Sequence, residues 1–419
     1  MLRDVREGQA EEPARGFFAP DRDEDRRPRP GGRVTPARLV LRIAVCIGAL
    51  VALDLAIAPS FAPPETYMTA YRLPRTAPTA SIADYANAID LAARAPQHRP
   101  IAAFLGASPT YGQRISDARS TFPAAFAAAS EASGTPFQAF NLATNGQLVG
   151  DYLVLARRFS RDADVVFVQL TYHTFSPTQG RLRIRYPELP AVLGVPLSDA
   201  EGKLLGLPAR TGSLGMPGVA SSIDAPLGRW WTLWRERDVI DRRLFGGPPR
   251  QTLPAMLEPA TTTSTAEATF TVLPDDAAND GSASFDSLDP GARMTAIALY
   301  AEDSSFTVSA SDDQVRLLDE LAGTLASEHK KAVFFISPMN FDVIDSYGLI
   351  DPAQYASNIG ELRAVVGSHG LRFIDLNTEA ERVPVADFVD ISHTNDAGGA
   401  LVGRLLWDLT ASYIATVTP

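Results

Sequence analysis

The stretch that decides the fold is Ile101-Ala-Ala-Phe-Leu-Gly-Ala-Ser108, in which five apolar residues end at a glycine. A short continuous apolar run bounded by a turn residue predicts a strand that is buried on both faces. Four similar runs follow, separated by helical stretches. We predict strands at 101–105, 137–142, 164–170, 331–337 and 371–376, and helices at 121–132, 147–159, 311–329, 352–366 and 397–414. This alternation predicts an α/β fold, with a five-stranded parallel sheet sandwiched by helices.

One long segment, 176–305, interrupts the alternation and is rich in Gly, Pro, Ser and Thr. A stretch this long without clear periodicity predicts an insertion or lid between two parts of one domain, 95–175 and 306–419. Inside it, residues 229–245 hold three of the four tryptophans. They are interpreted as a helix packed on the sheet, a substrate groove, a membrane-surface helix or a partner contact.

The composition excludes several classes of site. The chain has 419 residues, a formal net charge of −11 and one cysteine, Cys46, so an intrachain disulfide or a cysteine zinc cluster cannot form. The five histidines are scattered, and no pair has the i, i+4 spacing of a helical metal site. We therefore predict no metal and no cofactor. The acidic balance also argues against a nucleic-acid partner.

The N-terminal region carries a candidate membrane anchor. The apolar run at 39–58 spans roughly 30 Å as a helix, enough to cross the hydrocarbon core. Six arginines and no acidic residue lie between Arg26 and Arg42, which predicts a cytoplasmic N-terminus. Residues 1–38 are then a disordered cytoplasmic tail, 59–94 a linker, and the rest of the chain extracytoplasmic or periplasmic.

A cleaved signal peptide and a lipoprotein at Cys46 are the alternatives to this anchor. Both small-residue cleavage sites after the apolar run are followed by proline, and the basic leader is long for a signal peptide. Valine also precedes Cys46, where a lipoprotein has a small residue. These features favour an uncleaved, single-pass anchor in the cytoplasmic membrane.

A serine and a histidine stand where catalytic groups are expected. Ser108 follows the first strand and enters a helix, the place where open α/β sheets hold their sites. His393 precedes the last helix and can exchange a proton near neutral pH, while Asp390, three residues earlier, can hold its second ring nitrogen. Asn395 or Asp396 can instead cap the last helix, which leaves His393 unexplained.

The segment Asn141-Leu-Ala-Thr-Asn-Gly146 follows the second strand. Glycine lets the backbone approach a reacting centre closely, and its N–H can donate to an oxyanion. A simple turn is the other interpretation.

Together these segments resemble the SGNH (GDSL-like) hydrolase family. Gly106-x-Ser108-x-x-x-Gly112 matches its first block, with Ala107 where many members have aspartate. The segment 141–146 has the spacing of the second block, and Asp390-x-x-His393 matches the last. The resemblance implies a flavodoxin-like three-layer fold with Ser108 as nucleophile, His393 as base and Asp390 as the group that orients it. The implied oxyanion donors are the Ser108 backbone N–H and Gly146.

The third block departs from the family pattern, because His173 stands where members have an asparagine donor. His173 either donates a hydrogen bond to the oxyanion through a ring N–H or is a structural histidine. The segment Phe334–Asn340 is similar to the D-alanyl transfer protein of teichoic acid synthesis, a membrane-anchored member. Such members often work beside a membrane-bound O-acyltransferase.

The resemblance implies a serine esterase or O-acyltransferase that handles acyl groups on an envelope polysaccharide. Its partners would be the glycan or acyl ester and a membrane-bound O-acyltransferase. The alternative is a catalytically weak binding or assembly protein with the same fold, which Ala107 and His173 favour.

Overall fold

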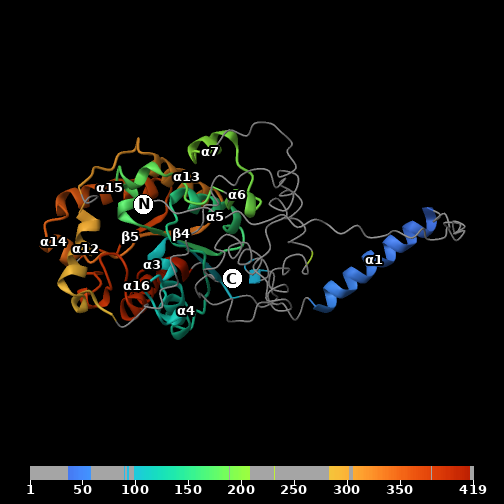
Figure 1. The fold of residues 1–419 in the computed structure, drawn as a ribbon, viewed down its shortest axis with the longest axis horizontal. Coiled ribbons are helices and arrows are strands. Elements are labelled where there is room, and N and C mark those ends of the chain that lie inside the picture. The colour runs from blue at the N-terminus through green and yellow to red at the C-terminus, as the bar shows by residue number, and fades with distance from the viewer. Residues whose placement is uncertain are drawn as a thin grey trace, which may run out of the picture. The chain divides into compact units, whose positions relative to one another are not determined.

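Five parallel strands form one sheet in the order β2-β1-β3-β4-β5, of which β4 and β5 are labelled in Figure 1. The strands are β1 (Ile101–Leu105), β2 (Gln138–Asn141), β3 (Val165–Leu170), β4 (Lys331–Ile336) and β5 (Arg372–Asp375). The structure, a computed structural model, describes residues 36–57, 89, 92–93, 99–187, 189–207, 231, 283–301, 305–378 and 380–415. The predicted α/β class and all five predicted strands are confirmed.

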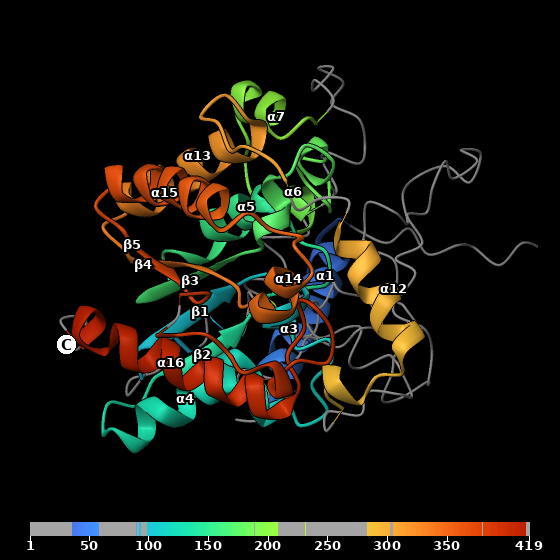
Figure 2. The same ribbon diagram turned by 90° about the vertical axis from the view of Figure 1, so that its left-hand side faces the viewer.

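Helices cover both faces of this sheet, as Figure 2 shows. One face carries α4 (Phe122–Ala132) and α16 (Asp396–Ile414), and the other carries α5 (Val149–Phe159), α13 (Asp313–Ser327) and α15 (Pro352–Ser368). Side chains alternate between the faces along each strand, so Phe104 and Phe167 stack at 4.5 Å toward the α4 layer. Leu105 and Val168 join the opposite core.

Two glycines let α16 approach the elements beside it closely. A β-carbon at Gly403 would lie 2.4 Å from Ala125 Cβ and 2.6 Å from the Phe122 carbonyl oxygen on α4. One at Gly399 would lie 2.3 Å from the Ser120 carbonyl oxygen. The position of α16 therefore depends on the absence of side chains at these points.

The order of the strands decides where a site can form. The chain moves from β1 to β2 on one side and then to β3 on the other side of β1. The carboxyl end of β1 is thus a topological switch point, where open α/β sheets bind their ligands. Ser108 lies in the turn that follows this end of β1.

Several helices in the structure are absent from the sequence prediction. Short helices have too few residues to show a period of 3.6, and this applies to α6 (Leu189–Val192), α7 (Asp199–Leu204) and α14 (Phe341–Ser346), whereas α3 (Ser108–Tyr111) forms where Ser108 was expected to enter a helix. The longer α12 (Pro290–Ala301) lies within the segment predicted as an insertion. Of the tryptophan-rich stretch 229–245, only Trp231 is among the described residues.

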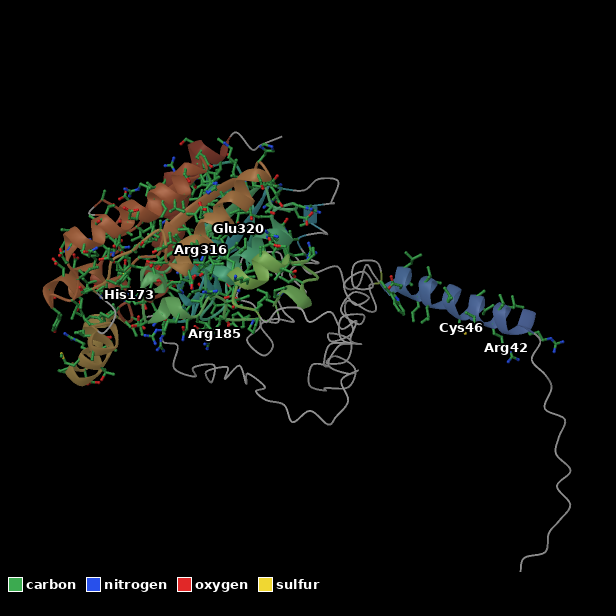
Figure 3. The ribbon with its side chains drawn as sticks, turned by 90° about the horizontal axis from the view of Figure 1, so that it is seen from above. Arg42, Cys46, His173, Arg185, Arg316 and Glu320 are labelled. Atoms are coloured by element: carbon green, nitrogen blue, oxygen red, sulfur yellow. The ribbon has the colours of Figure 1, made fainter. Side chains whose placement is uncertain are left out.

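The chain divides into two units, Met1–Leu53 and Asp54–Pro419, and the first holds most of the predicted anchor. Helix α1 (Pro36–Ile57) covers most of the predicted anchor and carries Arg42 and the exposed Cys46 (Figure 3). Within the described part of the chain, no helix combines the length and apolar character that crossing a membrane requires. This finding does not support the predicted transmembrane helix. Most of the predicted tail (1–38) and linker (59–94) lies outside the described residues.

Candidate active site

Ser108 is the first residue of α3, and Gly106 and Ala107 separate it from the end of β1. The turn that presents it needs the two glycines of the first block. A β-carbon at Gly106 would lie 2.7 Å from both Gln169 Oε1 and Thr110 Cβ. Gly112 ends α3 in the left-handed conformation (φ 82°), and its N–H donates to the Ser108 carbonyl oxygen at 3.0 Å. The spacing of the block therefore fits a strand followed by one tight helical turn.

Gln169 holds this turn and was missed from the sequence. Its Oε1 accepts hydrogen bonds from the backbone N–H groups of Ala107 (3.0 Å) and Thr110 (3.3 Å), and its side-chain amide donates to Thr171 Oγ1 (2.9 Å). Gln169 is fully buried. The sequence does hold one sign of this role, because Gln169 is the single polar residue in the otherwise apolar run 165–170. A buried polar side chain nearly always has a hydrogen-bond partner, so its presence there indicates a contact within the fold.

Replacing Gln169 with leucine is expected to cost about 1–3 kcal/mol of stability, because two backbone N–H groups lose their buried acceptor. It is also expected to lower kcat by about 100-fold, because the Ser108 turn shifts relative to His393. Urea unfolding and ester hydrolysis measure the two effects. Gln138→Leu, at the start of the edge strand β2, is the matched control and should change both much less. Equal effects of the two variants would contradict a special role for Gln169.

The histidine and the aspartate meet the serine, as predicted from their place in the chain. His393 Nε2 lies 2.8 Å from Ser108 Oγ, and His393 Nδ1 lies 2.9 Å and 3.0 Å from the two carboxylate oxygens of Asp390. With Asp390 ionised, we assign the proton of the neutral ring to Nδ1, which leaves Nε2 to accept the Ser108 hydroxyl proton. These three side chains thus form a continuous hydrogen-bonded chain from carboxylate to hydroxyl.

A tight turn before α16 holds His393 and Asp390 together. Asp390 Oδ1 accepts from the backbone N–H groups of Ser392 and His393, both at 2.8 Å. The Val389 N–H donates to the His393 carbonyl oxygen at 2.8 Å, which closes the turn. Ser392 Oγ lies 3.3 Å from His393 Nδ1 and is a further neighbour that the sequence did not single out.

The electrostatics of the site keep Asp390 ionised. Burial raises the pKa of the Asp390 carboxyl, but the charge of His393 and the hydrogen bonds from His393 and the turn backbone outweigh it, so that the pKa falls from 3.8 to about 2. Arg114 adds positive charge, because its Nε lies 3.9 Å from Asp390 Oδ2. No spacing rule points to Arg114, since its contact depends on the path of the loop after Gly112.

The lowered pKa of Asp390 predicts a loss of stability in acid. Between about pH 4 and pH 2 the unfolded chain binds a proton at this carboxyl while the folded chain does not, so the group's contribution of about 2 kcal/mol disappears as the pH falls. Urea unfolding of the wild type and Asp390→Asn at pH 5, 4, 3 and 2 measures it. The difference in the free energy of unfolding between the wild type and Asp390→Asn should shrink by about 2 kcal/mol over this range. A difference that stays constant would overturn the prediction.

Asn395 and Asp396 have the structural roles that the sequence left open. Asn395 Oδ1 accepts from the Gly398 N–H at 3.0 Å and caps α16, while its amide donates to the Ala386 carbonyl oxygen at 2.9 Å. Asp396 Oδ1 accepts from the Ser116 N–H at 2.8 Å. Because Ser116 belongs to the loop after Ser108, Asp396 ties the serine loop to the histidine loop.

The predicted oxyanion donors lie at the same edge of the sheet as Ser108. Gly146 follows β2 with φ 75°, and the Thr144 N–H in the same loop donates to the Gly106 carbonyl oxygen at 3.3 Å. Asn141 uses its side chain within the fold, since its amide donates to the Thr110 carbonyl oxygen at 3.0 Å. The oxyanion roles of the Ser108 N–H and Gly146 stay predictions.

His173 lies in the short 3-10 helix after β3, η4 (Tyr172–Phe175), and is 9 % exposed. Its ring stands edge-on to Tyr172, with the ring centres 5.7 Å apart. The oxyanion role of His173 stays a prediction.

Comparison with known proteins adds little to this geometry. No protein-family model matches the chain, and no curated protein matches its sequence significantly. The crystal structure of Est24, a carbohydrate acetylesterase from Sinorhizobium meliloti, aligns with 75 % of this chain and 100 % of that chain, at 10 % identity and a TM-score of 0.30. A similarity this low carries no functional argument. In the parts of the chain that the structure describes, no group of three or more His, Cys, Asp or Glu side chains is arranged to hold a metal ion.

Proposed function

We propose that this protein is a serine esterase or O-acyltransferase of the SGNH type, which transfers acyl groups through Ser108. The observation that carries the proposal is the hydrogen-bonded chain from Asp390 through His393 to Ser108, with 2.8 Å between His393 Nε2 and Ser108 Oγ. A serine hydroxyl is a weak nucleophile until a base within hydrogen-bond reach removes its proton.

The first half of the reaction forms an acyl-enzyme. Ser108 Oγ attacks the carbonyl carbon of an ester while its proton passes to His393 Nε2. The ionised Asp390 stabilises the imidazolium that results. The C–O bond to the alcohol then breaks, and the alcohol leaves with the proton from His393.

The second half resolves the acyl-enzyme. Water or a sugar hydroxyl gives its proton to His393 and attacks the acyl carbon, and Ser108 recovers its proton as the acyl group leaves. Attack by water makes the protein an esterase, and attack by a sugar hydroxyl makes it a transferase. We propose an acetyl-like acyl group on an envelope polysaccharide, which rests on the sequence resemblance.

The test is covalent labelling of the full-length protein with a fluorophosphonate probe, followed by mass spectrometry. We expect one labelled serine, Ser108, and no label in Ser108→Ala. Labelling and ester turnover that are equal in both proteins would contradict the proposal. A wild type that neither labels nor turns over esters, yet is needed for acylation in cells, would support the alternative of a binding or assembly protein.

We also propose that the site lies outside the cytoplasm. The sequence supports this through its apolar run and the arginines before it, and nine large apolar side chains on α1 are 43–69 % exposed. Their exposure suggests that a membrane covers them. Fractionation of the full chain and of a chain lacking residues 1–58 tests this, and a soluble full chain would contradict it. Pull-down of the intact protein would test the proposed membrane-bound O-acyltransferase partner.

A further inference from the structure

The backbone of Arg185 and Tyr186, in the segment that follows β3, is fixed by hydrogen bonds beside the loop of Gly146. The carboxylate of Asp151, which is fully buried, accepts three backbone hydrogen bonds, from Leu148 (2.8 Å), Arg185 (2.9 Å) and Tyr186 (2.9 Å). The Tyr186 hydroxyl also donates to the Asn145 carbonyl oxygen at 2.5 Å. The backbone at Arg185 therefore has a defined position beside the second sequence block.

The side chain of Arg185 lies next to Gly146. A β-carbon at Gly146 would lie 3.7 Å from Arg185 Nε. Arg185 is nevertheless exposed at the surface of the domain (Figure 3). Its chain neighbour Arg183 pairs with Asp313 at 2.5 Å, whereas no carboxylate among the described residues pairs with the Arg185 guanidinium.

This guanidinium is therefore a positive charge beside Gly146 with which no described carboxylate pairs. The loop of Gly146 contacts the Ser108 loop through the hydrogen bond from Thr144 to Gly106. Arg114, in contrast, has the carboxylate of Asp390 at 3.9 Å. A guanidinium binds carboxylates and phosphates well, because its planar fork matches two oxygens at once.

We infer that Arg185 is a specificity-determining residue that binds a carboxylate or phosphate on the alcohol part of the ester. The inference rests on the proposed function, in which a small acyl group is bound at Ser108 and the larger alcohol part extends along the surface. An exposed side chain beside Gly146 can reach that part. The natural substrate is then an acidic glycan rather than a neutral one.

The test compares three aryl acetates on the full-length protein: 4-acetoxybenzoate, 4-acetoxyphenyl phosphate and the neutral 4-acetoxybenzamide. Arg185→Gln is expected to lower the ratio of kcat/KM for an anionic ester to that for the neutral ester by about ten-fold, mostly through KM. Arg185→Lys should restore part of the ratio, and added salt should lower it in the wild type. Comparing the benzoate with the phosphate shows which anion the site prefers.

Arg181→Gln is the matched control, since Arg181 is an exposed arginine in the same segment. Its ratio should stay within two-fold of the wild type. Equal ratios in wild type and Arg185→Gln, or an equal fall in Arg181→Gln, would overturn the inference. Failure of the proposed function is distinguishable, because the wild type would then hydrolyse none of the three esters faster than Ser108→Ala.

Discussion

Replacing Ser108 with alanine is expected to lower kcat/KM for ester cleavage by about 10⁴- to 10⁶-fold, because the acyl-enzyme cannot form without the hydroxyl. The loss should appear in kcat rather than in KM, since the hydroxyl acts in the transition state. Initial rates with 4-nitrophenyl acetate measure it. Ser368→Ala, an exposed serine on α15, is the matched control and should keep wild-type activity.

The double variant gives a sharper test of the same arrangement. His393→Ala alone should cost about as much as Ser108→Ala, and the two together should cost little more, because base and nucleophile act as one unit. Their hydrogen bond of 2.8 Å is the structural reason for this expectation. Additive losses would mean that the two side chains act independently and would contradict the proposed mechanism.

Replacing Gly403 with alanine is expected to destabilise the fold by about 1–3 kcal/mol, since the new β-carbon would meet Ala125 Cβ at 2.4 Å and backbone atoms of α4. The clash must push α16 away from α4. Because the turn with His393 leads directly into α16, we also expect lower esterase activity. Thermal unfolding and ester hydrolysis of the purified protein measure the two effects.

Gly360→Ala is the control for this substitution, because Gly360 lies inside α15 and no atom beyond its neighbours in the helix backbone would lie within 4 Å of its β-carbon. Alanine favours a helix over glycine by about 1 kcal/mol, so this variant should be slightly more stable than the wild type. Two variants with the same chemical change should therefore shift stability in opposite directions. A stable, fully active Gly403→Ala protein would contradict the close packing of α16 on α4.

The sequence predicted the parts of the fold that depend on local composition. Each of the five apolar runs formed a strand, and the periodic helical stretches formed helices whose ends differ from the prediction by a few residues. Short elements such as α6 and α14 were missed, because four to six residues show no periodicity. The strand order was not predicted, since pairing depends on contacts between distant segments.

The residues of the candidate site also fall into two groups, those that the sequence identified and those that only the structure showed. Ser108, His393 and Asp390 were found because each belongs to a short block with recognisable spacing. Gln169, Arg114 and Arg185 were not found, because their roles come from which loops the fold places beside them. A glutamine in a strand or an arginine in a loop has no local pattern that marks it as part of a site.

The sequence by itself determined the class of the fold and the residue types available for acyl transfer. Apolar periodicity and short motif blocks involve residues that are close together in the chain, so both can be recognised without the structure. Only the tertiary structure decided that a serine and a histidine 285 positions apart share a hydrogen bond, and that the Arg185 side chain lies beside Gly146. The physical reason is that hydrogen bonds and charges act over a few ångströms in space. Those distances depend on how the sheet and α16 pack, not on separation along the chain.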